Sequence, residues 1–150
     1  MFNERIWKEG EQKVQEYMKR NGYKILMTNF SCVGVELDIV AILPKTIQQK
    51  KLKMQMKQKM IEDKKNKLIY KNGFKNSIKQ IQDLLIITEV KARDNDKFGK
   101  GFEQISEHKK HNIIRGARYL QKDDRFKNCQ IRFDVASVDN GEITYIENAF

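Results

Sequence analysis

Two acids and a lysine stand in segments where an apolar strand is expected. Asp38 is flanked on both sides by apolar residues of the run 35–43, and Glu89 and Lys91 follow the apolar run that begins at Leu84. Because side chains alternate along a strand, Glu89 and Lys91 share a face. A charge at the end of a buried strand is costly unless a partner pairs with it or coordinates it. The residues therefore form either a salt-bridged strand end or a functional site.

The chemistry that these residues could perform depends on how the two strands pair. In an antiparallel hairpin, Asp38 and Glu89 would lie at comparable depth, and their carboxylates would repel unless a cation lay between them. Oxygen ligands of this kind suit Mg²⁺, which takes one or two carboxylates together with water and phosphate. Lys91 would then reach an attacking water or a scissile phosphate, as in metal-assisted phosphodiester hydrolysis.

The charge of the chain is concentrated in one segment. The 150 residues carry a formal net charge of +10. Residues 45–80 contain twelve lysines and only two acids, Glu62 and Asp63, so this segment accounts for the whole net charge. A basic excess favours a polyanionic partner, with nucleic acid ahead of an acidic membrane surface. The other 114 residues are neutral overall, so the high pI says little about them.

Composition also indicates the cellular compartment in which the protein resides. Cys32 and Cys129 form no C-x-x-C motif and no metal-binding spacing, which is typical of a reducing cytoplasm. No apolar run approaches the roughly 18 residues of a membrane span, and charged residues interrupt the N-terminal segment that a signal peptide would occupy. We therefore expect a cytoplasmic protein that is not embedded in a membrane.

Hydrophobic periodicity predicts a single α/β domain over residues 1–150, with a mixed sheet flanked by helices. The predicted helices cover residues 3–20 and 102–121, and the predicted strands cover 23–30, 35–43, 83–92, 130–138 and 142–147. The lysine-rich insert 45–80 separates the second and third strands. Its apolar residues recur every four or seven positions, which favours one helix, and Asn72-Gly73 predicts a small hairpin over 68–74. Lysines without compensating acids would equally suit a mobile segment.

Other candidate residues have simple structural interpretations beside the functional ones. His108 and His111 have the spacing of a helical metal chelate, but without a third soft ligand they are better interpreted as surface residues. Arg132 and Asp134 alternate with core positions and predict a structural ion pair, and Phe150 predicts a packed C-terminus.

Taken in order, the motifs resemble the YraN-like family of uncharacterised bacterial proteins. That family is similar to archaeal Holliday-junction resolvases and belongs to the PD-(D/E)xK nuclease superfamily. The residues that carry the resemblance are Gly10-Glu11, Asn21-Gly22-Tyr23, Glu36-Leu37-Asp38-Ile39-Val40, Glu89-Val90-Lys91-Ala92-Arg93, Phe98-Gly99, Lys109, Ala117-Arg118-Tyr119-Leu120, Arg132-Phe133-Asp134-Val135 and Asn148-Ala149-Phe150. The resemblance covers residues 8–44 and 84–150 and is specific in the order and spacing of these motifs.

The resemblance implies the restriction-endonuclease-like αβββαβ core and a set of roles. Asp38 and Glu89 would be catalytic metal ligands for Mg²⁺ or Mn²⁺, with the Val90 carbonyl as a third oxygen, and Lys91 would position or activate water. Glu11 would be an accessory acid reaching the site from the first helix. The family also implies DNA as a partner, branched or structured by analogy with resolvases, and a homodimer.

Further residues belong to this hypothesis without being required by it. Glu36 is either a second accessory acid or simply exposed, and Gln104 either supports the site from the start of the second helix or does not. Lys109 and Arg93 are candidates for phosphate contacts, although Lys109 could merely solvate its helix.

Two departures from the family pattern are visible. Val35 stands where the family has glycine before the first acid, and the insert stands where the family has a short loop. A hairpin can accept a long insert because the entropic cost of loop closure grows slowly with length.

The sequence thus predicts a Mg²⁺-dependent nuclease-like protein that binds DNA and hydrolyses its phosphodiester bonds. The alternative is a non-catalytic module that binds nucleic acid through the lysine-rich insert. The insert could equally be filler, or its apolar stripe could contact another protein.

Overall fold

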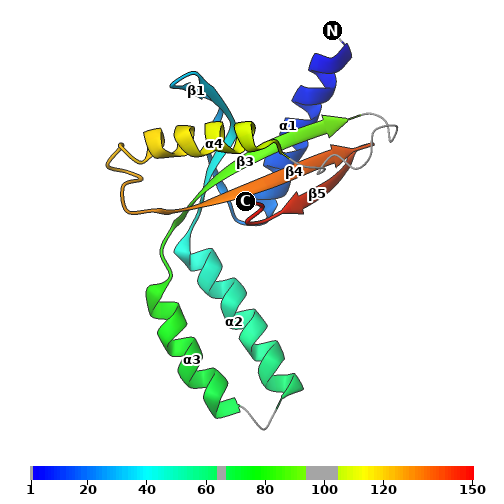
Figure 1. Ribbon diagram of the computed structural model, residues 1–150. Coiled ribbons are helices and arrows are strands. Elements are labelled where there is room, and N and C mark those ends of the chain that lie inside the picture. The colour runs from blue at the N-terminus through cyan, green and yellow to red at the C-terminus, as the bar shows by residue number, and fades with distance from the viewer. Residues whose placement is uncertain (1, 64–66, 94–104) are drawn as a thin grey trace.

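A computed structural model describes residues 2–63, 67–93 and 105–150. The chain forms a five-stranded mixed sheet in the order β1-β2-β3-β4-β5, in which only β3 and β4 run parallel (Figure 1). The elements are α1 (Phe2–Arg20), β1 (Lys24–Cys32), β2 (Val35–Leu43), α2 (Lys45–Glu62), α3 (Lys67–Gln80), β3 (Leu84–Arg93), α4 (Glu107–Leu120), β4 (Gln130–Asp139) and β5 (Glu142–Ile146). The predicted mixed sheet flanked by helices is therefore confirmed.

The two faces of the sheet carry separate cores, each covered by one amphipathic helix. On one face Val14 and Met18 of α1 pack with strand residues such as Ile39, Ile86 and Val90. This helix approaches closely because Gly10 has no side chain, and a Cβ there would lie 2.5 Å from the Cβ of Ala92.

On the other face, Ile113, Ala117 and Leu120 of α4 pack with Leu37 and Leu85 of the strands. The helix begins later than its periodicity predicted. Its N-cap is Ser106, whose hydroxyl accepts a hydrogen bond from the Lys109 N–H at 3.2 Å. Ile105, inside the predicted helix, is buried but precedes the observed one, and residues 102–104 of the predicted helix lie outside the described part of the chain.

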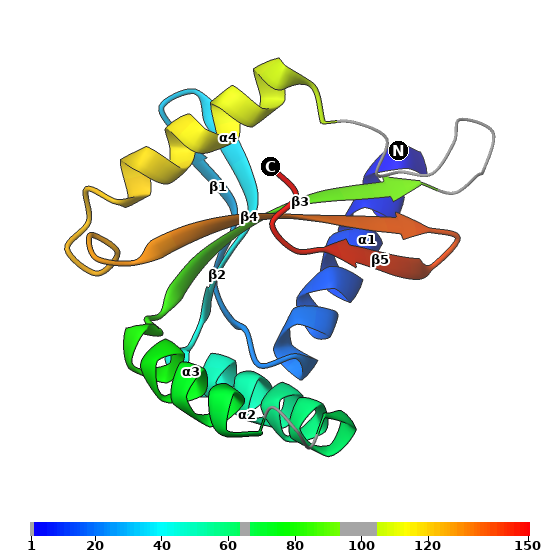
Figure 2. The ribbon, with the colours of Figure 1, turned by 60° about the horizontal axis from the view of Figure 1, so that its bottom comes forward.

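The insert forms two antiparallel helices, α2 and α3, that extend away from the sheet (Figures 1 and 2). The predicted hairpin over residues 68–74 is wrong, because Gly73 lies inside α3 and its carbonyl accepts a hydrogen bond from the Ser77 hydroxyl. The Asn-Gly turn signal is overridden by helical spacing. Phe74 and Ile78 lie one helical turn apart and are both half-buried.

The base of this helical pair is fixed to the sheet. The Lys45 N–H donates to Asp83 Oδ1 at 2.7 Å, and Gln48 Nε2 donates to the Leu43 carbonyl at 3.0 Å. Ile47 packs against the core beside α1. Further along α2, Met54 and Ile61 are 72% and 73% exposed. Of the apolar residues that repeat every seven positions, Ile47, Met54 and Ile61, only Ile47 is packed. Leu52, Met56 and Met60, which repeat every four positions, are half-buried.

A buried polar network ties the end of the chain to the sheet. Asp134 is fully buried and accepts hydrogen bonds from Arg132, from the Tyr145 hydroxyl and from the Asn148 N–H. The Arg132 guanidinium lies 2.7 Å from its carboxylate, so the predicted structural ion pair is confirmed. Phe150 stacks on Phe133 with ring centroids 5.1 Å apart, as the predicted packed terminus requires.

None of the helices in the described residues is long and apolar enough to cross a bilayer. Cys32 and Cys129 are both free thiols.

We predict that Asp134→Ala lowers the free energy of unfolding by about 3–5 kcal/mol, because the largely buried Arg132 guanidinium then keeps only the half-exposed carboxylate of Glu147 at 3.3 Å. Urea denaturation monitored by circular dichroism measures the change. Glu142→Ala, which removes an exposed acid at the start of β5, is the control and should leave stability unchanged. Equal stability of the two variants would show that the network contributes little.

Candidate functional site

Asp38 and Glu89 meet where β2 and β3 separate. The antiparallel ladder between these strands runs from Leu43↔Leu84 to Ile39↔Thr88, and the two acids are the next residues beyond it. The predicted antiparallel pairing is therefore observed, and it brings the two carboxylates within hydrogen-bonding reach of each other. Beyond this point β3 continues beside β4, whereas the hairpin of β1 and β2 curls toward α4 (Figures 1 and 2).

A local reversal of β2 explains why it leaves β3 at Asp38. Leu37 packs in the core beneath α4, whereas Ile39 packs in the core beneath α1. Residues two apart on a regular strand face the same side, so the strand turns over between them. Its partner does the same, because Asn29 lies opposite Asp38 and has a left-handed φ of 48°. Asparagine tolerates this conformation better than most residues.

The Asp38 side chain occupies the gap that the separating strands leave. Its Oδ2 accepts a hydrogen bond from the Val90 N–H at 2.8 Å. In a strand the N–H and the carbonyl of one residue point to the same neighbouring strand, so the Val90 carbonyl is directed toward the same gap. The carbonyl that the family resemblance implies as a third ligand therefore lies on the side of β3 that faces Asp38.

The surroundings of Asp38 favour its neutral form. Burial raises its pKa to about 7, and the negative charge of Glu89 adds to the effect. The Val90 N–H and the ammonium of Lys109 act in the opposite direction but do not cancel it. A cation between the two acids would stabilise the ionised form of Asp38 and so lower its pKa.

Lys109 supplies such a cation from α4. Its Nζ lies 3.1 Å from Glu89 Oε1, and the Glu89 side chain is only 10% exposed. The sequence left open whether Lys109 contacts phosphate or solvates its helix, and the structure instead places it in an ion pair with a candidate metal ligand. That contact joins residues twenty positions apart, and the sequence pattern gives no direct signal for it.

Glu11 lies close enough to Asp38 and Glu36 for their charges to act on it. The pKa of Glu11 is raised by burial and by the charges of Asp38 and Glu36, although a hydrogen bond from Asn29 Nδ2 at 3.1 Å opposes the shift. Glu36 is exposed. The acid that the resemblance places near the site from the first helix is therefore near it. Asn29 was missed by sequence reasoning, although an asparagine in a predicted strand is itself a signal of irregular backbone.

The remaining candidates are only partly described. Lys91 lies two residues after Glu89 on β3, is half-buried and shares its face. Arg93 ends β3, and only its backbone is described; Gln104 lies outside the described residues. His108 and His111 are exposed and make contacts within α4, to Asn112 and to the Glu107 carbonyl.

The donor set suits a hard divalent ion. Two carboxylates and a main-chain carbonyl are oxygen ligands of the kind that Mg²⁺ takes while keeping several waters. Across the part of the chain that the structure describes, no three side chains of His, Cys, Asp or Glu form a closed metal cage. The ligand roles of Asp38, Glu89 and Val90 therefore stay predictions.

Comparison with known proteins gives the family. The model of the uncharacterised protein family UPF0102 matches residues 10–138. The chain belongs to this family. The match confirms the YraN-like resemblance of the sequence and covers both acids, Lys91 and Lys109.

Several relatives of UPF0102 align over nearly the whole chain. A UPF0102 protein of Persephonella marina is 32% identical, over 100% of this chain and 97% of its own length. One of Caldicellulosiruptor saccharolyticus is 30% identical, over 94% of this chain and 92% of its own. One of Clostridium acetobutylicum is 29% identical, over 99% and 96%.

We predict that Asp38→Asn stabilises the metal-free protein at pH 8 by on the order of 2 kcal/mol and much less at pH 4. An unfolded aspartate ionises near pH 4, whereas folded Asp38 holds its proton to about pH 7. The wild type therefore loses stability across that interval, and asparagine, which can still accept the Val90 N–H, does not. Urea denaturation in EDTA at the two pH values measures the difference.

Glu36→Gln, which removes an exposed acid on the same strand, is the matched control for this measurement. A stability difference between Asp38→Asn and the wild type that does not change with pH would contradict the electrostatic description of the site.

Proposed function

We propose that this protein is a divalent-metal-dependent nuclease that binds DNA and hydrolyses phosphodiester bonds at Asp38 and Glu89. The observation that carries the proposal is the meeting of two carboxylates where β2 and β3 separate. A salt-bridged strand end needs one acid and one base, whereas this arrangement brings two acids together and offsets them with Lys109.

The roles in the proposed reaction follow from these positions. A bound Mg²⁺ would polarise the phosphoryl group and lower the pKa of a bound water. Asp38, Glu89 and the Val90 carbonyl would hold it, and Lys91 would orient the attacking water or the phosphate from the same face of β3. Glu11, supported by Asn29, would be positioned to accept a proton.

The Lys109–Glu89 ion pair gives α4 a part in this proposal. In the absence of a metal the ammonium balances the charge of Glu89 at 3.1 Å. Were a divalent ion held between the acids, Glu89 would no longer need the ammonium, and Lys109 would be free to contact a DNA phosphate. On this proposal Lys109 would contact phosphate in the metal-bound protein, which is one of the two roles that the sequence left open for it.

The substrate class rests on the family resemblance and on charge. Similarity to resolvases adds branched or structured DNA and a homodimer to the proposal, as a fold-level analogy. Cleavage of several DNA forms in parallel therefore tests the activity and the preference together.

We predict that the wild type cleaves at least one of linear duplex, single-stranded or four-way-junction DNA with Mg²⁺ or Mn²⁺. Asp38→Asn and Glu89→Gln should reduce cleavage to background, and Lys91→Met should reduce the rate by about a hundredfold or more. Glu107→Gln, which removes an exposed acid at the start of α4 whose ion pair among the described residues is with Lys110, should retain full activity.

The readout is gel analysis of end-labelled DNA, with EDTA as the metal-free control. Residual cleavage of equal rate in the wild type and in Asp38→Asn would come from a contaminant, and it would end the proposal.

A second candidate function is binding without cleavage through the insert. It is favoured by the exposed lysines Lys50, Lys53 and Lys57, which lie along one side of α2 and form no ion pair with a described residue. The insert is poorly placed to deliver DNA to the two acids, because it leaves the sheet five residues beyond Asp38 on β2. At about 3.3 Å per residue this is some 17 Å away, and α2 and α3 extend away from the sheet (Figure 1).

We predict that replacing residues 49–79 with a short glycine-serine linker leaves metal-dependent cleavage within about threefold of wild type. The replacement keeps the base residues Ile47 and Gln48, which contact the sheet, and loop closure adds little cost. Loss of DNA binding and of cleavage together in this variant would favour the insert as the contact surface.

A further inference from the structure

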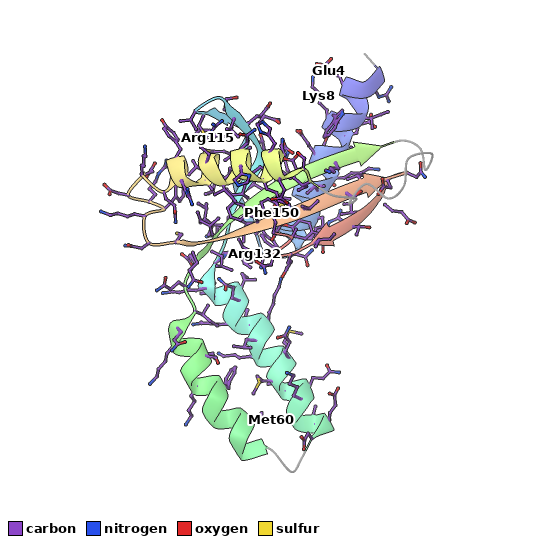
Figure 3. All side chains as sticks on the ribbon, in the orientation of Figure 1. Glu4, Lys8, Met60, Arg115, Arg132 and Phe150 are labelled. Atoms are coloured by element: carbon purple, nitrogen blue, oxygen red, sulfur yellow. The ribbon has the colours of Figure 1, made fainter. Side chains whose placement is uncertain are left out.

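The outward side of α4 is the most distinctive basic surface outside the acid site. The one exposed acid of this helix, Glu107 in the first turn, pairs with Lys110 at 2.7 Å. The other exposed residues recur at helical spacing: His108, His111, Arg115, Arg118 and Tyr119, followed just after the helix by Lys122. We call these six residues the α4 outer face. Figure 3 shows Arg115 on the side of α4 turned away from the sheet.

The cations of the α4 outer face lack acidic partners. Arg115, Arg118 and Lys122 form no ion pair with any residue in the described ranges, whereas exposed Arg5 and Arg125 pair with Glu9 and Asp123 at 2.8 and 2.6 Å. Lys122 instead lies over the Tyr119 ring, 5.8 Å from its centroid. An uncompensated basic face with arginines and an aromatic ring is suited to a phosphate backbone.

The geometry of the helix matches a DNA strand. Arg115 and Lys122 are seven residues apart, which is a rise of about 10 Å along the helix. Phosphates on one strand of B-DNA advance about 3.4 Å each along the axis, so the three cations span about three phosphates.

The α4 outer face is also connected to the acids. The same helix carries Lys109, three residues into its first turn, against Glu89. A DNA backbone that lies along α4 would therefore pass beside the candidate metal ligands at the N-terminal end of the helix. The lysines of the insert have no such link, because α2 and α3 leave from the far end of β2 and β3 (Figures 1 and 2).

We propose that the α4 outer face, rather than the lysine-rich insert, is the surface along which the protein binds the DNA backbone. This inference rests on the proposed nuclease function for the identity of the ligand and adds the surface that positions it. The net positive charge of the molecule lies in the insert, and on this account it does not determine DNA binding.

The test compares two variants that remove the same charge. One is Arg115→Ala/Arg118→Ala/Lys122→Ala, and the other is Lys50→Ala/Lys53→Ala/Lys57→Ala. Binding of a fluorescein-labelled duplex of about 20 base pairs is measured by fluorescence anisotropy in EDTA over a series of salt concentrations. Without a divalent ion no cleavage is needed for the result.

We predict that the α4 variant lowers the slope of log affinity against log salt by about 2.7, since each phosphate contact contributes about 0.9. The insert variant should keep the wild-type slope. Arg115→Lys/Arg118→Lys/Lys122→Arg, which preserves charge, should keep it too, and it separates loss of contact from loss of folding.

Three outcomes would overturn the inference: an unchanged slope in the α4 variant, an equal fall in both variants, or no duplex binding by the wild type. Failure of the nuclease proposal has a different signature, because DNA would then bind with this salt dependence but remain uncut when Mn²⁺ is added.

Discussion

The repulsion between the buried carboxylate of Glu89 and the half-buried carboxylate of Asp38 is the constraint on which this structure depends. Asp38 and Glu89 meet where water is partly excluded, and burial together with the neighbouring charge raises the pKa of Asp38 to about 7. The Val90 N–H and the Lys109 ammonium each offset part of this cost, at 2.8 and 3.1 Å. A protein that needed only a stable sheet would place apolar residues at these positions, because an apolar replacement of similar volume is often more stable. The unfavourable arrangement therefore supports the proposed cation-binding role.

The surrounding elements are arranged to make that meeting occur. The turnover of β1 and β2 at Asn29 and Asp38 separates β2 from β3 and opens the gap into which the Asp38 carboxylate and the Val90 carbonyl are directed. On one face α1 brings Glu11 to the same point, and on the other α4 brings Lys109. The insert contributes nothing to this geometry, although it contributes the whole net charge of the chain. Charge composition and site location are separate properties in this protein.

Much of this could be predicted from sequence because the acids are out of place in their segments. The bounds of β2 were predicted residue for residue, and the antiparallel pairing with β3 followed from chain order. What could not be predicted depends on contacts between distant elements. The Lys109–Glu89 pair requires the packing of α4 on the sheet, and the left-handed Asn29 requires the turnover of the hairpin. The Asn72-Gly73 turn signal failed because helical packing of α3 against α2 outweighed a local preference.

The central claim is that the two acids form a site for a divalent ion, and a crystal soaked with Mn²⁺ tests it most directly. The account predicts an anomalous peak between Asp38 and Glu89, with the Val90 carbonyl as a further ligand and Lys109 withdrawn from Glu89. The same soak of Asp38→Asn should show no peak. A wild-type crystal that retains the Lys109–Glu89 ion pair, with no anomalous peak at the acids at millimolar Mn²⁺, would contradict the account.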